Sequence, residues 1–294
     1  MDLEQKAIER IKMASEMSLH HYGKPLVCTY SGGKDSDVML ELFKRSGVKF
    51  EVHNSHTTAD APQTVYHIRE VFRELELQGI KCDIDYHRQP DGSVITMWNL
   101  IPRKLLPPTR RVRYCCGILK ETFGDGYFIA TGVRWDESKK RREWGSFSQP
   151  KERLQASDEE IMLNSDNDIK RRITEHCMQK NKMVVNPIVD WTNTDIWEFI
   201  NAERIDTNIL YQCGYDRVGC IGCPMVGKKR WKEFADFPKY KEAYIRAFDR
   251  MLEVRKQRGK SRKWQSGKDV FLWWMEDENV EGQMSFEDFP EVLP

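Results

Sequence analysis

The first two-thirds of the chain alternates short apolar runs with longer segments whose apolar residues recur at helical spacing. The apolar runs predict strands at 24–31, 48–57, 81–88, 127–133 and 184–190. The helical spacing predicts helices in the charged N-terminal segment and at 35–47, 61–79 and 194–203. Strands that alternate with helices predict an α/β fold with a doubly wound, mainly parallel sheet. Ligands of such sheets bind beyond the carboxyl ends of the strands.

The ends of the predicted helices carry residues that commonly start and stop helices. Pro62 lies near the first turn of the 61–79 helix and Gly79 follows its last turn. Gly47 can cap the 35–47 helix, and Thr194 is the expected N-cap of the 194–203 helix.

Beyond Ile205 the pattern changes to a cysteine-rich loop, a long charged helix at about 228–258 and a tryptophan-rich segment at 263–277. We expect those tryptophans to pack in a core rather than to stack on bases. The resulting domain prediction is a nucleotide-binding α/β domain at 1–204, a helical, cysteine-containing region at 205–275 and a flexible acidic tail at 276–294. We also expect a mobile, charged loop at 136–160.

Charge and hydropathy narrow the possible partners. The 47 basic and 46 acidic residues give a formal net charge of +1, which argues against a protein dedicated to binding genomic DNA. Basic clusters nevertheless suit a polyanionic substrate, although solvated helix faces explain some of them equally well. No stretch approaches the ~20 apolar residues that cross a bilayer. We therefore expect no membrane partner and a cytoplasmic location.

The segment YSGGKDSDVML, residues 30–40, has the composition of a phosphate-binding loop. Gly32 and Gly33 lack Cβ atoms, so successive backbone N–H groups can converge on phosphate oxygens. Ser31 and Ser36 add hydroxyl donors, and Lys34 adds a positive charge. The helix predicted to follow directs its N-terminal dipole at the same point. The alternative is a plain turn between a strand and a helix.

The eight cysteines of a cytoplasmic chain are better candidates for metal ligands or functional thiols than for disulfides. Cys28 and Cys82 lie in predicted strands, where we expect them to be buried. Four others form two pairs, Cys115–Cys116 and Cys220-x-x-Cys223, which together offer enough thiolates to close a tetrahedral site. An iron–sulfur cluster, a zinc ion and unligated thiols are the three open alternatives. Cys177 and Cys213 have no assigned role.

Arginines next to the first cysteine pair add a second expectation. Arg110, Arg111 and Arg113 precede Cys115 at an expected helix start, where the helix dipole and the positive charges favour thiolate. The same arginines could bind a substrate anion, or they could form a solvated loop.

The glycine loop resembles the PP-loop of the ATP pyrophosphatases, which bind the pyrophosphate of ATP. Further segments resemble the phosphoadenosine phosphosulfate reductase group, in the order that the group has them. They are HTTADAPQTVYHIREV (56–71), LPPTRRVRYCCGILK (106–120), TGVRWDES (131–138), NPIVDWTNTDIWEFI (186–200) and GCIGCPM (219–225). The resemblance, which covers about residues 20–275, implies an adenine nucleotide alpha hydrolase-like fold.

The resemblance also implies a site for an adenine nucleotide, either ATP or a related sulfonucleotide. Its binding residues would be Tyr30, Ser31, Gly32, Gly33, Lys34, Asp35, Ser36, Thr57, Gly132 and Arg134. Of these, Lys34, Asp35 and Arg134 would be catalytic. Asp35 is a candidate for water-mediated contact with Mg²⁺.

The cysteine quartet resembles the [4Fe-4S] arrangement of assimilatory adenylylsulfate reductases and of the ATPase component of DNA phosphorothioation systems. Sulfonucleotide reductases carry a catalytic cysteine in a C-terminal segment, whereas no cysteine follows Cys223 in the 294 residues. The expected function is therefore ATP-dependent activation, forming AMP and pyrophosphate, with sulfur transfer to a nucleic acid or nucleotide. A cysteine desulfurase is a candidate sulfur donor. The alternatives are a sulfonucleotide reductase and a non-catalytic nucleotide and iron–sulfur sensor.

The acidic tail contains GQMSFEDF at 282–289, which resembles the peptides that dock on bacterial sliding clamps. A disordered tail without a partner is the alternative.

Overall fold

A computed structural model describes residues 2–137, 174–177, 182–260 and 264–276. Most of the predicted charged loop at 136–160, the whole of the acidic tail beyond Glu276 and the clamp-like peptide at 282–289 lie outside the described residues.

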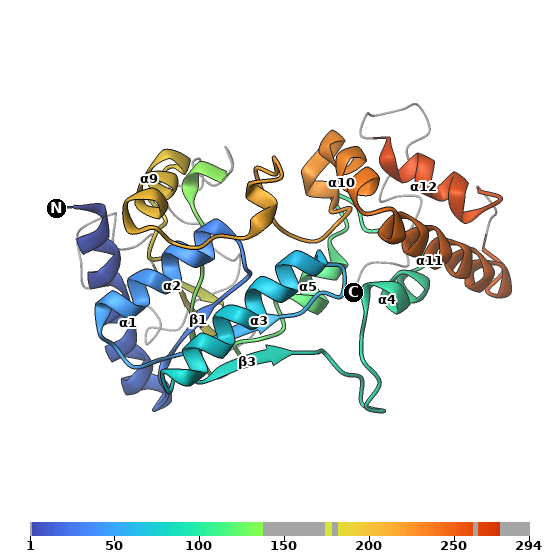
Figure 1. The fold of residues 1–294 in the computed structure, drawn as a ribbon. Helices are drawn as coiled ribbons and strands as arrows, with labels where there is room; N and C mark the ends of the chain where they lie inside the picture. Colours follow the sequence, from blue (N-terminus) through green and yellow to red (C-terminus); the bar gives the residue numbers. More distant parts are fainter. Residues whose placement is uncertain (1, 138–173, 178–181, 261–263, 277–294) are drawn as a thin grey trace. The chain divides into compact units, whose positions relative to one another are not determined.

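The helices and strands follow one another largely as the apolar pattern predicts (Figure 1). The strands are β1 Leu26–Thr29, β2 Phe50–Ser55, β3 Cys82–Asp85, β4 Phe128–Ala130, β5 Thr174–Cys177 and β6 Lys182–Val185. The α-helices are α1 Leu3–Tyr22, α2 Lys34–Ser46, α3 Pro62–Leu77, α4 Met97–Lys104, α5 Tyr114–Leu119, α9 Asn193–Glu203, α10 Arg230–Asp236, α11 Pro238–Gln257 and α12 Gly267–Met275. Short 3₁₀ turns are η1 Trp135–Glu137, η3 Ile209–Tyr211 and η4 Pro224–Lys229.

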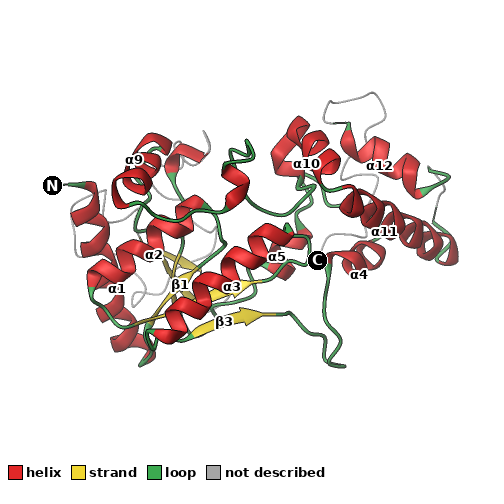
Figure 2. Cartoon of the chain, viewed as in Figure 1, coloured by secondary structure: helices red, strands yellow, loops and turns green. Residues whose placement is uncertain are grey.

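The strands, which Figure 2 draws in yellow, form one mixed sheet. Their order in the sheet is β3-β2-β1-β4-β6-β5. β1 pairs in parallel with β2 and β4, and β4 pairs in parallel with β6. β5 lies antiparallel at the edge beside β6 and was not predicted. The sheet grows outward from β1 in both directions, which confirms the prediction of a doubly wound, mainly parallel α/β fold.

The described residues form two compact units, and each is built from separate stretches of chain. The first contains the sheet and comprises Met1–Asn54, Pro62–Asp85 and Phe123–Val218; the second comprises Ser55–Ala61, Tyr86–Thr122 and Gly219–Pro294. This division differs from the consecutive domains expected with a boundary at residue 204. Side chains from 205–218 bond to the glycine loop, and 86–122 belongs with the C-terminal helices, so no single cut in the sequence separates the units.

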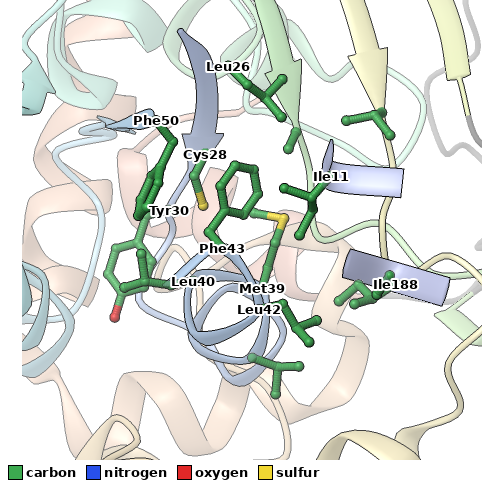
Figure 3. Packing of buried hydrophobic residues seen from close by; sticks show 14 of the residues in the cluster. Ile11, Leu26, Cys28, Tyr30, Met39, Leu40, Leu42, Phe43, Phe50 and Ile188 are labelled. Atoms are coloured by element: carbon green, nitrogen blue, oxygen red, sulfur yellow. The ribbon is translucent and has the colours of Figure 1, made fainter. Parts of the chain in front are cut away.

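The core of the first unit surrounds β1 and α2 (Figure 3). Leu26, Val27 and Cys28 are each at most 2% exposed, which explains why the first three residues of β1 are apolar rather than alternating. The ring of Phe43 on α2 packs against the ring of Phe50 on β2, with the centroids 5.0 Å apart. Burial also raises the pKa of the Cys28 thiol, which confirms the expectation that this cysteine is a core residue.

Two predicted boundaries are wrong at the end of the first unit. The strand expected at 184–190 is β6, which ends at Val185 and is followed by a turn over 187–190. Pro187 lacks an N–H group and cannot continue the ladder. The N-cap of α9 is Thr192 rather than Thr194, because the Thr192 hydroxyl accepts the Asp195 N–H at 3.2 Å while the Asp195 carboxylate accepts the Thr192 N–H at 2.6 Å.

The prediction of one long helix at 228–258 is also wrong, because this stretch contains two helices, α10 and α11. The break falls at Phe237, whose φ of −123° and ψ of 64° are not helical. Pro238 disfavours helical geometry in the residue before it and then begins α11 as an N1 proline.

The second unit has an aromatic core, as expected for the tryptophan-rich segment. Trp264 and Trp274 are 7% and 4% exposed. The buried guanidinium of Arg230 donates to the Trp274 carbonyl at 3.0 Å and lies 4.9 Å from the centre of its ring. These contacts hold α10 against α12.

None of the helices within the described residues combines the length and the apolar character that a membrane crossing requires.

An ion pair between the buried Arg10 and the partly buried Asp190 joins α1 to the turn that follows β6. The Arg10 guanidinium donates to both oxygens of Asp190, at 2.6 and 2.8 Å, and to the Pro187 carbonyl at 2.7 Å. Burial alone would raise the pKa of Asp190, but the hydrogen bonds and charge of Arg10, together with the Asp190 backbone N–H and the charge of Lys6, leave that pKa below its ordinary value. The pair therefore stabilises the folded protein above the ordinary carboxyl pKa of about 3.9 and loses its contribution as the pH falls through the lower pKa of the folded state.

We predict that Asp190→Asn lowers the free energy of unfolding by about 3 kcal/mol at pH 7, because it leaves a buried guanidinium without its counter-charge. Urea unfolding measures the difference in the free energy of unfolding between Asp190→Asn and wild type, which should become smaller below pH ~4. Glu51→Gln is the matched control, since its partner Lys81 is 68% exposed and such pairs contribute at most about 1 kcal/mol. Equal stability of Asp190→Asn and wild type at pH 7 would contradict the assignment.

Candidate functional site

The glycine loop lies in the first unit, between the end of β1 at Thr29 and the start of α2 at Lys34. Gly33 is the N-cap of α2, and Gly32 has φ +71°, a conformation that favours glycine. A Cβ atom on Gly32 would lie 2.8 Å from Cγ1 of Ile68. The predicted strand–loop–helix arrangement is confirmed, and Gly32 is required both by its backbone conformation and by the close approach of α3.

The two loop serines form hydrogen bonds within the loop. The Ser36 hydroxyl donates to the Gly33 carbonyl at 2.7 Å and accepts the Gly33 N–H at 3.1 Å. The Ser31 hydroxyl lies 3.4 Å from that of Ser36. Ser36 is thus a local brace that fixes the curvature of the loop.

Three charged side chains meet at the start of α2. Oδ2 of Asp35 accepts from Lys34 Nζ at 3.1 Å, and its Oδ1 accepts from Arg134 Nε at 2.6 Å. The side chains of Lys34 and Arg134 are 7% and 4% exposed. Gly132 lies beside Asp35, because a Cβ atom on it would be 3.5 Å from the Asp35 backbone. The structure therefore brings together Lys34, Asp35, Gly132 and Arg134, with Asp136 3.9 Å from Arg134, and two cations at a helix N-terminus suit a phosphate.

The residues on either side of the loop are tied together by a buried polar network that the sequence did not reveal. The Tyr30 hydroxyl donates to Oδ1 of Asp37 at 2.5 Å, and Nε2 of His67 lies 3.2 Å from the same oxygen and 3.0 Å from the Tyr30 hydroxyl. Within the described residues, Oδ2 of Asp37 is buried without a hydrogen-bond partner. Burial raises the pKa of Asp37, although His67 and Tyr30 favour its charged form.

Two residues from the segment after α9 also contact the loop. Asn208 donates to the Gly32 carbonyl at 3.3 Å and to the Thr64 hydroxyl at 3.1 Å, and the Tyr211 hydroxyl accepts the Lys34 N–H at 2.9 Å. Neither belongs to a motif, and the domain prediction placed both outside the nucleotide-binding domain. No sequence signal distinguishes them from ordinary loop residues.

The first cysteine pair lies in the second unit, in α5. Arg113 is the N-cap residue of this helix, as the expected helix start implies, and donates to the Cys116 sulfur at 3.2 Å. A hydrogen bond from Cys115, together with Arg113, lowers the pKa of Cys116 to about 5. The same hydrogen bond, in which Cys115 keeps its proton, raises the pKa of Cys115.

The second cysteine pair lies in a turn that the second unit holds firmly. Cys220 bridges Asp60 in antiparallel fashion, and its sulfur lies 3.3 Å from the Thr57 hydroxyl. The Gly222 N–H donates to the Glu233 carboxylate at 2.7 Å. Gly222 has φ +76°, and a Cβ atom there would lie 2.5 Å from the Phe234 ring. Burial raises the pKa of Cys220 to about 12.

The four cysteines lie within electrostatic range of one another. The pKa of Cys115 is raised by Cys116, Cys220 and Cys223, and three of the four thiols raise the pKa of Lys120. Four thiols with cations beside them are a suitable donor set for a thiophilic metal or an iron–sulfur cluster. In the part of the chain that the structure describes, however, no three His, Cys, Asp or Glu side chains are arranged so that they could hold a metal ion.

The remaining predicted residues are placed as follows. Thr57 belongs to the second unit, where its hydroxyl donates to Asp60 at 2.7 Å. Arg110 donates to the Pro224 carbonyl at 3.1 Å and so joins the arginine loop to the CxxC turn, whereas Arg111 is exposed. Cys213 is exposed and follows η3, and Cys177 ends β5.

We predict that Tyr30→Phe lowers the free energy of unfolding by about 1–3 kcal/mol, because it removes a hydrogen bond from the buried Asp37 carboxyl. Urea unfolding checks this value. Tyr66→Phe makes the same change on a 63% exposed side chain of α3 and should stay within about 0.5 kcal/mol of wild type. If both variants match wild type, the network does not stabilise the loop.

Comparison with known proteins places this geometry in a family. The chain is 24% identical over 232 residues to the uncharacterized protein MJ0066 of Methanocaldococcus jannaschii, covering 75% of the chain and 41% of that protein. It is 22% identical over 216 residues to an adenosine 5'-phosphosulfate reductase of Staphylococcus haemolyticus, covering 71% of the chain and 74% of the reductase. The chain thus spans less than half the length of the first relative.

A similar solved structure is the phosphoadenylyl-sulfate (PAPS) reductase of Candida auris in its phosphate complex, with a TM-score of 0.45 and 14% identity over 73% of this chain and 88% of that one. The model of the phosphoadenosine phosphosulfate reductase domain matches residues 25–226, which is more than half of the chain and includes the glycine loop and all four paired cysteines. The chain therefore belongs to the phosphoadenosine phosphosulfate reductase domain family.

Proposed function

We propose that the protein is a transferase that binds ATP on the 31–36 loop, cleaves it to AMP and pyrophosphate, and activates a nucleic acid or nucleotide for sulfur transfer. The observation that carries this proposal is the buried Lys34–Asp35–Arg134 cluster beside two glycines at the start of α2. Family membership supports an adenine nucleotide as the ligand.

The two glycines, the charged residues at the start of α2 and Arg134 have separate roles in this reaction. Gly32 and Gly33 let the main chain approach the phosphate oxygens, and Lys34 and Arg134 offset the negative charge that develops at the α-phosphate. Asp35 holds these two cations in position, since each of its oxygens accepts from one of them. Because both oxygens are engaged, we assign Asp35 a water-mediated contact with Mg²⁺, which would neutralise phosphate charge when bound.

The proposed chemistry has two steps. An oxygen of the acceptor attacks the α-phosphorus, the α–β bond breaks, and pyrophosphate leaves with the electron pair. A sulfur nucleophile then displaces AMP, which carries away the acceptor oxygen. If the sulfur arrives as a persulfide, for example from a cysteine desulfurase, a separate thiol must then form a disulfide with the donor cysteine to release the product.

The cysteine quartet is the proposed site of a [4Fe-4S] cluster, held by Cys115, Cys116, Cys220 and Cys223. When bound, the cluster would supply redox or sulfide-binding chemistry. Arg113 and Lys120 would offset the negative charge of the thiolates, and the positive φ of Gly222 lets the turn between Cys220 and Cys223 fold tightly. A zinc ion is the second candidate for the same donors.

Reduction of a sulfonucleotide is the second candidate function. A lowered pKa gives Cys116 the thiolate character of a nucleophile, and the Staphylococcus haemolyticus relative is named as an adenosine 5'-phosphosulfate reductase. A reductase would release sulfite from adenylylsulfate, whereas an ATP pyrophosphatase would release AMP and pyrophosphate from ATP. A sensor would bind nucleotide and do neither.

We predict that anaerobically purified protein converts ATP to AMP and pyrophosphate when the acceptor is present, and that Lys34→Ala slows this turnover about 10²–10³-fold, as expected for loss of a preorganised cation. Lys44→Ala removes a 37% exposed lysine from the same helix and should keep full activity. The assay measures AMP and pyrophosphate from ATP beside sulfite from adenylylsulfate. Full activity of Lys34→Ala, or sulfite as the product, would refute the first proposal.

For the metal site we predict about four iron atoms and four acid-labile sulfides per chain in protein purified without oxygen. Cys220→Ser should lose most of this iron. Cys213→Ser, which removes an exposed cysteine outside the quartet, should retain it. Elemental analysis and the visible absorption spectrum check both variants. Zinc in place of iron, or iron unchanged in Cys220→Ser, would argue against the cluster.

A further inference from the structure

The hydroxyl of Tyr211 lies directly on the glycine loop. Its oxygen accepts the Lys34 N–H at 2.9 Å and lies 3.4 Å from the point where a Cβ atom on Gly33 would be. The segment that carries it is anchored by Asn208, which is fully buried and bonds to the Gly32 carbonyl and the Thr64 hydroxyl. The buried Asn208 thus fixes the segment from which Tyr211 contacts the loop.

The amide that Tyr211 engages is one that the proposed function needs. Lys34 is the first residue of α2, and N–H groups of a first helical turn have no acceptor within the helix. Such groups bind phosphate oxygens at helix N-termini. Because this N–H has a single hydrogen to donate, the Tyr211 oxygen and a phosphate oxygen compete for it.

The chemistry of the two acceptors favours the phosphate in this competition. A phenol oxygen is a neutral acceptor, and burial, together with the nearby Asp35 and Asp37 carboxylates, raises the pKa of Tyr211, so its hydroxyl keeps its proton at neutral pH. A phosphate oxygen is charged, and the buried cations of Lys34 and Arg134 at the same end of α2 offset the two carboxylates. Hydrogen bonds that involve an ionised partner are roughly twice as strong as neutral ones.

We propose that the Tyr211 hydroxyl occupies a phosphate-oxygen position on the loop and yields it to the pyrophosphate group of the nucleotide. This inference rests on the proposed function, because it assumes that pyrophosphate binds at the loop. Tyr211 is then a specificity-determining residue: a ligand with a charged phosphate chain displaces it, whereas a nucleoside offers no acceptor strong enough to do so.

Tryptophan fluorescence can report the displacement of Tyr211. The rings of Trp197 on α9 and Tyr211 are in edge-to-face contact, with their centroids 5.2 Å apart and their planes at 89°. When Tyr211 leaves Lys34, the surroundings of the Trp197 ring change. Pyrophosphate should therefore change the tryptophan fluorescence of the wild type, and Trp197→Phe should remove most of that change.

Calorimetric titration of the full chain with inorganic pyrophosphate tests the proposal. Tyr211→Phe keeps the ring against Trp197 but removes the competing oxygen, so it should bind pyrophosphate roughly 2- to 10-fold more tightly, the equivalent of one neutral hydrogen bond. Tyr215→Phe makes the same chemical change four residues further along the chain and should bind as wild type does.

The outcomes separate this inference from the function on which it rests. Binding by wild type that is lost in Lys34→Ala, together with unchanged or weaker binding by Tyr211→Phe, overturns the role of Tyr211 and leaves the loop assignment intact. No binding by wild type overturns both. If Tyr211→Phe does not fold, a pyrophosphate-induced fluorescence change that persists in full in Trp197→Phe overturns the displacement.

Discussion

The two ion pairs of the Asp35 carboxylate are the interactions on which the glycine loop depends. Lys34 and Arg134 are both almost fully buried, and two buried cations with no anion between them would be strongly unfavourable. Asp35 accepts from each at hydrogen-bonding distance, so the carboxylate makes it possible to keep two positive charges in the interior of the first unit. Arg134 also lies 3.9 Å from the Asp136 carboxylate, and both cations lie at the N-terminal end of α2, which favours a phosphate.

The same carboxylate is bonded to side chains from two separate elements. Asp35 and Lys34 are on α2, whereas Arg134 follows β4, the strand that pairs in parallel with β1. The loop after β1 and the loop after β4 therefore meet at the carboxyl ends of adjacent strands. Parallel pairing explains this, because it brings equivalent strand ends to one edge of the sheet. Tyr30, Asp37 and His67 add a second tie between the residues that flank the glycine loop.

Sequence periodicity was sufficient for the fold class and for most elements of the first unit. β1 was visible because both its faces are buried, and α2 because a glycine cap ends it. The backbone geometry of the loop can also be predicted, because the positive φ at position 32 is one that few residues other than glycine adopt. The contacts of Tyr211 and Asn208 with the loop could not be predicted. They depend on where a segment without apolar periodicity packs in the folded chain. The unit boundaries were missed for a related reason: the chain passes between the two units five times, and local patterns carry no record of which stretches pack together.

The two candidate sites use charge in opposite ways, and this difference bears on the chemistry each can perform. At the glycine loop, the Asp35 carboxylate holds the Lys34 and Arg134 cations in place before any anion binds, so these two charges need little rearrangement. At the cysteines the pKa values differ from thiol to thiol. The pKa of Cys116 is lowered, whereas the pKa values of Cys115 and Cys220 are raised. A full set of thiolates requires a cationic centre to replace those protons, because four uncompensated negative charges in one turn and one helix start would be costly. The charges at the first site are fixed by ion pairs within the fold, whereas the charges at the second site would be balanced only in the proposed cluster.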